Sequence, residues 1–473
     1  MNARKILGYA LGPIGSAAFG LISLPLISWY FPAEDIGRIV FLQTVSSLII
    51  LVLGLGLDHA YIRNYYEVEN KASLFKSLSA LPFLLVTLAS IAIALWNPAW
   101  PSVLVFDLNN GVLGGLFLLF LTTALFSRFL SLILRMQEKA FAFSISQLIP
   151  KFFILVFVLI LVAFGLPKNT LSLIFSYTAA QIVTVMILAY QSKDELKSAI
   201  TSSFSKDLSN QALQYGLPLA FGNLAYWGFT SVDRFVLKEM ASLEQLGIYS
   251  MAVNFGAIAL IFQSIFSTIW APMVFKWVKE NKNLDKVSQV AVSMTALISA
   301  IICLVGIFSP VVTWILPSKY EPVQFILLSS LLFPLFYTLT EVSGIGLNVI
   351  KKTWLITVIN FVCLTINLSL LKFLVPLLGA RGAAIASAIS FCIFFMIKTE
   401  LSSKLWQKLP RMKLYSNATL CLLMCISYTY FGTKSNYYIF SLLWLAGLIL
   451  LTIFHKKQIL ESVSMIKTRL GKN

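Results

Sequence analysis

Charged residues are scarce in this chain of 473 residues. Asp, Glu, Lys and Arg together make up 12% of it, whereas hydrophobic residues make up 58%. A soluble globular domain carries about 25% charged residues, because its surface faces water. The composition therefore excludes a soluble protein of this length, and also a disordered or fibrous chain. We expect an all-α integral membrane protein with little mass outside the bilayer.

Metal-binding, redox and nucleotide-binding motifs are also missing. The two histidines, His59 and His455, are far apart in sequence, and none of the five cysteines forms a CxxC pair. Neither a zinc site nor a disulfide framework is therefore supported. The Walker A pattern, GxxxxGK followed by Ser or Thr, does not occur, nor do HExxH and GxSxG. We expect no metal, no cofactor and no catalytic residue, in a chain that is not an enzyme.

What is present is a series of long apolar stretches. A membrane-spanning helix needs about 20 mostly apolar residues, and the chain offers about fourteen such stretches. The connections between them are short and leave no room for a folded domain outside the membrane. The predicted spans are residues 6–29, 39–57, 78–96, 114–134, 142–165, 170–190, 213–233, 248–271, 289–309, 323–345, 354–375, 382–398, 415–432 and 438–454.

Basic residues indicate which side of the membrane each connection faces. Lys and Arg total 36 and Asp and Glu total 19, which gives a net charge of +17. If the N-terminus is cytoplasmic, 27 basic residues fall in inner segments and seven in outer segments, and Lys151 and Lys372 lie inside spans. Cytoplasmic connections carry such an excess, so we expect both termini in the cytoplasm. The charge then faces anionic inner-leaflet lipid and does not indicate nucleic acid.

An internal repeat suggests how the spans are grouped. Residues 32–37 (PAEDIG) resemble residues 242–247 (SLEQLG), and their glycines, Gly37 and Gly247, are 210 positions apart. The repeat predicts two parallel six-helix lobes. In such an arrangement the site lies between the lobes, near the membrane midplane, and it opens when one lobe rocks against the other. We accordingly expect an N-terminal lobe at 1–205, a C-terminal lobe at 206–405, and two extra helices with a basic cytoplasmic tail at 406–473.

Ionisable residues inside the predicted spans are candidate functional residues. A charge near the centre of a membrane helix costs at least about 2.5–3.5 kcal/mol on insertion scales. Lys151 lies near the middle of the fifth span. We expect it to face a cavity, and we consider this more consistent with its position than a structural ion pair. Three other ionisable residues lie nearer the ends of spans: Arg128, Glu341 and Lys372. Each can either extend its charged group to the membrane interface or bury it against a partner, and the sequence favours neither alternative.

The seventh predicted span carries a polar stripe. Asn223, Tyr226, Thr230 and Asp233 follow one another in steps of three, four and three, which places them on one face of a helix. Arg234 follows near the predicted outer end. A polar stripe in a membrane helix faces protein or water. We expect it to line a cavity, with hydrogen bonding between helices as the alternative.

Three stretches resemble the polysaccharide flippases of the multidrug/oligosaccharidyl-lipid/polysaccharide (MOP) exporter superfamily, the Wzx-type O-antigen translocases. The strongest runs from SVDRFVLK at 231–238 to SLEQLGIYS at 242–250, which is similar to the family's segment between spans seven and eight. The others are GLGLDHAYIRNY at 54–65 and GARGAA at 379–384. The plan of two six-helix lobes and two further helices covers the whole chain.

The resemblance implies a flippase in the bacterial inner membrane. It would move an undecaprenyl-diphosphate-linked oligosaccharide, such as an O-antigen unit, to the outer leaflet by alternating access, coupled to a proton or sodium gradient. By resemblance, Arg63, Asp233 and Arg234 carry the motif charges. Membrane lipids, a glycan polymerase and glycosyltransferases would be partners. The predicted substrate-binding residues are Lys151, Arg63, Arg234, Asn223, Tyr226 and Arg128, and the predicted ion-coupling residues are Asp233 and Glu341.

Three other functions remain open at this point. A multidrug or cation exporter on the same scaffold would favour acidic residues in its cavity. A membrane glycan polymerase or ligase would need acid and base groups on a substantial outer loop, and the longest outer connection, about residues 97–113, carries Asp107 as its only charge. A scaffold in a glycan-assembly complex would bind partner glycosyltransferases.

Overall fold

Helices form all the regular structure in the part of the chain that the structure describes. The computed structural model describes residues 3–281 and 284–454. No strand occurs within those two ranges, so the predicted all-α class is confirmed. The chain divides into two compact units, Met1–Ser250 and Met251–Asn473. The lobe boundaries expected after residues 205 and 405 stay a prediction.

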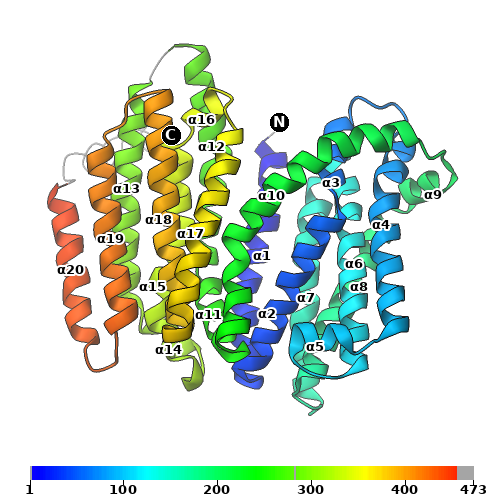
Figure 1. Ribbon diagram of the computed structural model, residues 1–473, viewed down its shortest axis with the longest axis horizontal. Coiled ribbons are helices and arrows are strands. Elements are labelled where there is room, and N and C mark those ends of the chain that lie inside the picture. Colours follow the sequence, from blue (N-terminus) through cyan, green and yellow to red (C-terminus); the bar gives the residue numbers. More distant parts are fainter. Residues whose placement is uncertain (1–2, 282–283, 455–473) are drawn as a thin grey trace. The chain divides into compact units, whose positions relative to one another are not determined.

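Unit 1 contains ten complete helices and the start of an eleventh within the described residues (Figure 1). Helix α1 packs against α7, and α8 packs against both α6 and α7. The helices are α1 (Ala3–Tyr30), α2 (Ala33–Leu53), α3 (Leu57–Asn64), α4 (Lys71–Trp96), α5 (Trp100–Phe106), α6 (Gly111–Met136), α7 (Ala140–Ala163), α8 (Thr170–Gln191), α9 (Lys193–Thr201), α10 (Lys206–Met240) and α11 (Leu243–Phe255), whose last residues belong to unit 2.

Unit 2 is built around α15 and α18, the two helices with the most buried residues in this unit. Helix α18 packs against α15, α17 and α19, and α13 packs against α15 and α20. The helices are α12 (Ala257–Lys279), α13 (Asp285–Phe308), α14 (Val311–Ile315), the 3-10 helix η1 (Ser318–Tyr320), α15 (Val323–Ser343), α16 (Gly346–Val349), α17 (Trp354–Leu378), α18 (Ala380–Leu405), α19 (Arg411–Phe431) and α20 (Tyr437–Phe454).

Ten of the described helices are long and apolar enough to cross a membrane. Shorter apolar stretches occupy residues 14–30 of α1 and 437–453 of α20. The spans predicted at 213–233 and 415–432 fall on α10 and α19, which are not among the ten. The protein is therefore a multi-pass membrane protein, as predicted, while the count of fourteen spans and the cytoplasmic side of the termini stay predictions.

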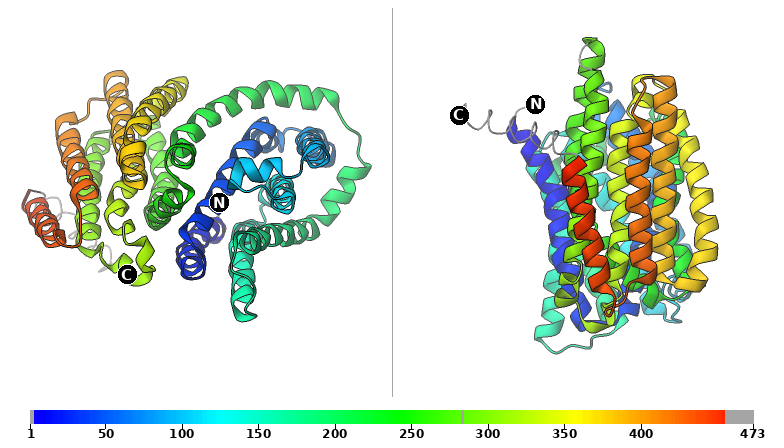
Figure 2. Two further views of the ribbon diagram at one scale, coloured as in Figure 1. Left: turned by 60° about the horizontal axis from the view of Figure 1, so that its bottom comes forward. Right: turned by 90° about the vertical axis from the view of Figure 1, so that its left-hand side faces the viewer.

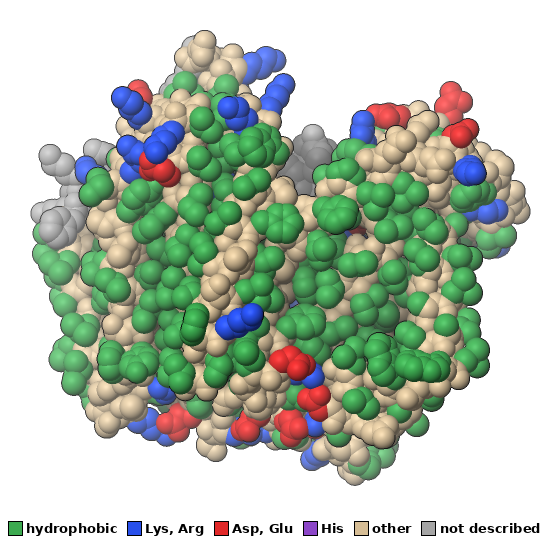
Figure 3. All heavy atoms as spheres, viewed as in Figure 1, with side chains coloured by type: hydrophobic (Ala, Val, Ile, Leu, Met, Phe, Trp, Pro, Cys, Tyr) green, Lys and Arg blue, Asp and Glu red, His purple; other side chains and the backbone are tan. Residues whose placement is uncertain are grey.

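Charged side chains gather at the ends of the helices. Figure 3 shows a hydrophobic band across the middle of each unit, with most of the visible Lys, Arg, Asp and Glu side chains above and below it. Large apolar side chains of the long helices are exposed, for example Leu88 at 56% and Phe175 at 57%. Such a surface would be unfavourable in water and is stable against lipid acyl chains.

Polar residues define where several helices of unit 1 begin. The side-chain oxygens of Asn70, Asn110, Asn169 and Ser205 accept hydrogen bonds from backbone N–H groups two or three residues later. These bonds satisfy donors that have no partner within the helix. Helix α10 contains Pro218 in its interior, and Figures 1 and 2 show α10 as a long, bent green ribbon. An interior proline removes a backbone hydrogen bond and bends a helix.

Candidate functional site

Polar side chains of α3, α6 and α10 meet in unit 1. We call Asp58, His59, Arg63, Arg128 and Asn223 the Asp58 cluster. The first three lie within the eight residues of α3, the fourth in the second half of α6, and the fifth in α10. Three of the five, Arg63, Arg128 and Asn223, were predicted from the sequence as substrate-binding residues.

The backbones of α3 and α10 touch where these side chains meet. Helix α3 begins after Gly56, whose φ of +70° lies in the left-handed region. A Cβ atom on Gly56 would lie 2.2 Å from the carbonyl oxygen of Gly216, and one on Gly216 would lie 2.7 Å from that of Leu55. Both positions therefore require glycine. This crossing holds α10 against α3 closely enough for their side chains to bond.

Asp58 positions the guanidinium group of Arg128. Its Oδ2 atom accepts a hydrogen bond of 2.9 Å from Nε of Arg128 and another from Nη2. The side chain of Asp58 is 10% exposed, and that of Arg128 is 47% exposed. Among the described residues, Nη1 of Arg128 has no hydrogen-bond acceptor. The guanidinium is thus held in one orientation while it keeps donors for a ligand.

Arg63 offers a second exposed guanidinium, at the other end of α3 from Asp58. It lies in the last turn of α3, and its Cζ atom is 4.2 Å from the centroid of the Tyr215 ring in α10. Cation–π attraction holds a guanidinium on the face of an aromatic ring. This attraction leaves the N–H groups of the guanidinium free to donate hydrogen bonds. Tyr215 was not predicted as a site residue, because nothing in the sequence places it beside Arg63.

His59 and Trp227 tie α10 to the cluster and to α2. The Nε2 atom of His59 lies 3.2 Å from Nδ2 of Asn223, and it lies 3.9 Å from Oδ2 of Asp58. One turn along α10, Nε1 of Trp227 donates a hydrogen bond of 2.9 Å to Ser47. Neither His59 nor Trp227 was predicted to take part in the site. Their partners on other helices, Asn223 and Ser47, are more than 160 positions away in the sequence.

Lys151 lies apart from this cluster, between α7 and α1. Its Nζ atom donates a hydrogen bond of 2.7 Å to the backbone carbonyl of Ser16. Small residues let the two helices approach here, since a Cβ atom on Gly12 would lie 3.0 Å from Cα of Ser144. The amine of this half-buried lysine therefore has a partner on a neighbouring backbone.

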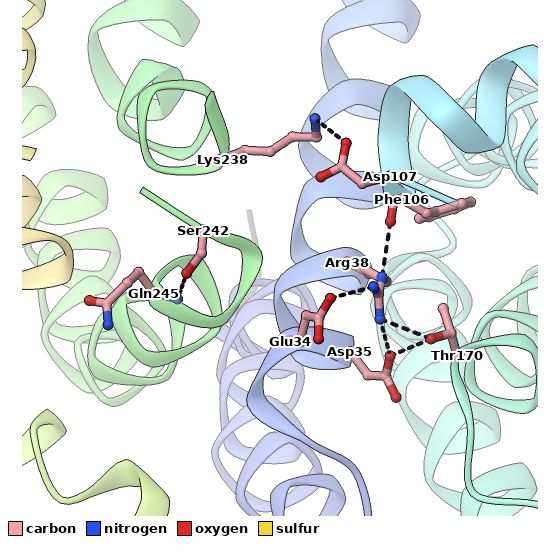
Figure 4. Close-up of polar contacts among 9 residues, drawn as sticks. All are labelled: Glu34, Asp35, Arg38, Phe106, Asp107, Thr170, Lys238, Ser242 and Gln245. Carbon is pink, nitrogen blue, oxygen red and sulfur yellow. Dashed lines mark hydrogen bonds and ion pairs between the residues drawn. The ribbon is translucent and has the colours of Figure 1, made fainter. Parts of the chain in front are cut away.

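A second polar group lies at the start of α2. Figure 4 shows the guanidinium of Arg38 between the carboxylates of Glu34 and Asp35, beside Thr170 and the backbone carbonyl of Phe106. Arg38 donates 3.0 Å and 3.1 Å hydrogen bonds to Phe106 O and Thr170 Oγ1. Its side chain is 10% exposed. This arrangement fixes the starts of α2 and α8 and the end of α5 to one another.

The end of α10 is anchored at the same level. Lys238 donates a hydrogen bond of 2.8 Å to Asp107 (Figure 4). The buried carboxylate of Asp233 accepts a hydrogen bond from the Tyr249 hydroxyl and one of 3.0 Å from Nη1 of Arg234. The predicted pair Asp233 and Arg234 therefore joins α10 to α11, at the opposite end of the polar stripe from Asn223.

The two halves of the internal repeat touch each other in this region. A Cβ atom on Gly37 would lie 1.8 Å from the carbonyl oxygen of Leu243, and one on Gly247 would lie 2.0 Å from that of Ala33. The contact is reciprocal, because each glycine faces the first residue of the other helix. The glycines that the repeat pairs at a spacing of 210 residues thus make equivalent contacts.

Glu341 lies in unit 2 with a buried partner. Its Oε1 atom is 3.8 Å from Nζ of Lys398, whose side chain is 4% exposed compared with 19% for Glu341. The Lys398 amine also lies 5.6 Å from the centroid of the Phe394 ring. Glu341 is therefore a shielded carboxylate beside one cation, at a distance too long for a strong hydrogen bond.

The structure thus separates the predicted residues into groups. Within unit 1, Asp58 and His59 link Arg128 to Asn223, and Tyr226 follows Asn223 by one turn of α10. Arg63 lies at the other end of α3, against Tyr215. Lys151 lies in the seam between α1 and α7, and Asp233 and Arg234 lie at the far end of α10. Their roles in binding or coupling stay predictions.

Comparison with known proteins places this fold. The chain is similar to the lipid II flippase MurJ in an inward closed conformation, with a TM-score of 0.69 and 16% identity over 95% of this chain and 99% of that one. It also resembles an outward-facing multidrug resistance MATE family transporter of the MOP superfamily, with a TM-score of 0.57 and 15% identity over 87% and 94% of the chains. An inward-facing MATE transporter gives a TM-score of 0.57 and 16% identity over 89% and 99%. The fold is that of the MOP superfamily transporters.

The sequence family is narrower than the fold. Residues 3–278, more than half of the chain, match the family described as polysaccharide biosynthesis protein. The chain belongs to this family, and the resemblance to polysaccharide flippases of the MOP superfamily is confirmed. No curated protein matches the chain. The protein is therefore a multi-pass membrane protein of polysaccharide biosynthesis, and an inner-membrane location fits this family.

Proposed function

We propose that this protein flips an undecaprenyl-diphosphate-linked oligosaccharide from the inner to the outer leaflet, by alternating access. The family supports a role in polysaccharide biosynthesis, and the similarity of the fold to a lipid II flippase supports a lipid-linked substrate. In this proposal the chain is a transporter and not an enzyme. Its substrate class is an anionic headgroup that carries sugars and a long isoprenoid tail.

The observation that carries the proposal is the pair of exposed guanidinium groups in the Asp58 cluster. Asp58 fixes the orientation of Arg128, and Tyr215 holds Arg63, while both arginines remain open to solvent or ligand. Guanidinium groups bind phosphate through paired N–H donors, and charge-assisted bonds of this kind are about twice as strong as neutral ones. Asn223 and Tyr226 follow on α10 as hydrogen-bonding and stacking groups for sugars.

The same chemistry explains why a protein is needed. A diphosphate cannot cross hydrocarbon, because the loss of its hydration shell costs tens of kcal/mol. A basic, hydrated site replaces that shell with fixed donors, while the isoprenoid tail stays in the bilayer. A multidrug exporter for cations is disfavoured, since two exposed arginines at the site would repel its substrate.

Glu341 is the better of the two proposed ion-coupling residues. Asp233 accepts hydrogen bonds from both Tyr249 and Arg234, so its carboxylate is already engaged. Glu341 has a single cationic neighbour at 3.8 Å. A shielded carboxylate with one loosely placed partner can exchange a proton or a sodium ion without dismantling a hydrogen-bond network.

Export of surface glycan in a strain that lacks this gene tests the proposal. We expect Arg128→Ala, at normal membrane abundance, to abolish surface glycan and to leave undecaprenyl-linked oligosaccharide in the inner leaflet. Arg128→Lys should restore export only in part, because an ammonium lacks the paired donors of a guanidinium.

Arg411 provides a matched control for Arg128. It is also an exposed arginine in an ion pair, here with Glu400, and its side chain is 42% exposed. Arg411→Ala should therefore retain export. Full surface glycan in Arg128→Ala and in Arg63→Ala would overturn the proposed site. Unchanged inner-leaflet intermediates in a complete deletion strain would overturn the proposed function.

A further inference from the structure

A pocket of about 440 Å³ lies in unit 1, and no residue of the Asp58 cluster lines it. It opens between the end of α3, the start of α4, the end of α6 and α9, on the side of the chain that is predicted to be cytoplasmic. Binding sites for small ligands fall in the range of about 300–1,000 Å³. The lining residues are Tyr61, Tyr65, Glu69, Asn70, Lys71, Ala72, Phe75, Ile133, Gln137, Asp194, Glu195 and Ser198.

The pocket has an excess of negative charge, although the chain as a whole has a net charge of +17. Glu69, Asp194 and Glu195 contribute three carboxylates, against the single ammonium of Lys71. That ammonium donates hydrogen bonds to the backbone carbonyls of Tyr65 and Val68 and has no ion pair with any described carboxylate. Within the described residues, none of the three carboxylates of the pocket forms an ion pair, so all three are available to a cationic ligand.

Aromatic rings form one wall of the pocket. The ring centroid of Tyr61 lies 5.7 Å from that of Tyr65 and 5.8 Å from that of Phe75. The Nζ atom of Lys71 lies 4.9 Å from the Tyr65 ring centroid, so this ring already receives a cation on its face. Burial, with smaller contributions from Tyr66 and Glu195, raises the pKa of Tyr65.

One lining residue, Gln137, has a buried hydrogen-bond acceptor without a donor. Gln137 donates from Nε2 to Glu195, while its own buried Oε1 atom accepts no hydrogen bond. A buried acceptor without a donor costs about 1–3 kcal/mol. Within residues 3–281 and 284–454, no three acidic, His or Cys side chains are placed to hold a metal ion. The carboxylates thus flank a volume larger than one ion.

We propose that this pocket binds an organic cation that carries a primary ammonium or guanidinium group. The charged group would lie among Glu195, Asp194 and Gln137, and its alkyl chain would lie against Tyr61 and Tyr65. Carboxylates and aromatic faces together select a cation, because both attract positive charge and the rings also shield the alkyl chain. The ligand could be a free amine of the cytoplasm or an Arg or Lys side chain of a protein.

Calorimetric titration of the purified full-length chain in a neutral maltoside detergent tests this proposal. Two probes distinguish the sources of the cation: agmatine, which carries both a guanidinium and an ammonium, and a Gly-Arg-Gly tripeptide with blocked ends. We expect binding by at least one probe. Glu195→Gln should weaken that binding by at least about ten-fold, since it removes one charge-assisted hydrogen bond and keeps the size of the side chain. Added salt should weaken it further.

Glu67→Gln is the matched control, because Glu67 is an exposed acid of the same connection that does not line the pocket. Its affinity should equal that of the unmodified chain. Asp194→Asn provides a second test if Glu195→Gln is not recovered as a monodisperse protein. Binding of agmatine identifies a free amine, and binding of the peptide alone identifies a protein side chain. Failure of both probes, or equal affinity in all the variants, would overturn the proposal.

Discussion

The reciprocal contact between Gly37 and Gly247 predicts a large effect from a single added methyl group. In Gly247→Ala, the new Cβ atom would lie 2.0 Å from the carbonyl oxygen of Ala33, whereas ordinary van der Waals contact begins at 3.4 Å. The starts of α2 and α11 would have to separate by about 1.4 Å. Overpacking of this kind costs about 1–3 kcal/mol.

Thermal unfolding in detergent, followed by intrinsic fluorescence, measures this effect. For a unit of 250 residues, each kcal/mol lost should lower Tm by about 2–4 °C. Gly37→Ala should lower Tm by a similar amount, because its Cβ atom would lie 1.8 Å from Leu243 O. The double variant should lose less than the sum, since one separation of the helix ends relieves both contacts.

Gly115→Ala is the control for these variants. Gly115 also lies in a helix of unit 1, but a Cβ atom there would meet no described atom within 4 Å. Alanine in place of glycine inside a helix is favourable by about 1 kcal/mol, so Tm should stay the same or rise. If Gly37→Ala and Gly247→Ala were as stable as Gly115→Ala, the two backbones would not be in contact and the reasoning would be refuted.

Three further predictions concern buried charges. Lys151→Ala should abolish surface glycan at normal membrane abundance, as measured by complementation, and full export would remove Lys151 from the mechanism. Arg38→Met should lower stability by about 3–5 kcal/mol in denaturant unfolding, because it leaves the Asp35 carboxylate buried without a cation; a loss below 1 kcal/mol would contradict this. Lys398→Met should impair export and lower stability, because it leaves the Glu341 carboxylate without its cation. Adding Glu341→Gln to this variant should restore stability but not gradient-driven export. Vesicle assays with an imposed gradient measure the export.

The helices could be predicted because each is a long apolar run. Ten of the predicted spans fall on helices of the length and hydropathy that a membrane requires. Helices α3, α5 and α9 were not predicted, because their eight, seven and nine residues are too short to cross a bilayer. The break between α2 and α3 depends on the left-handed backbone at Leu55 and Gly56, and the sequence of an apolar stretch does not predict a left-handed leucine.

The candidate site was predicted only residue by residue. Arg128 and Asn223 were selected as polar residues inside predicted spans, and Arg63 was selected by resemblance to the family's motif. Asp58 and Arg128 are 70 positions apart, and nothing local predicts their ion pair. For Lys151, the expected position facing a cavity stays a prediction. Its partner, a backbone carbonyl of α1, could not be predicted, since every residue of a helix offers the same carbonyl group.

The contact between Gly56 and Gly216 has a consequence for how substrate preference can be altered. Main-chain atoms make this contact, so it fixes the approach of two helices without dictating any neighbouring side chain. The exposed positions of α3, His59 and Arg63, can therefore be exchanged together between members of the family, while the buried residues of the helix are kept. Chimeras that retain both glycines should keep their architecture while they acquire the donor's glycan selectivity.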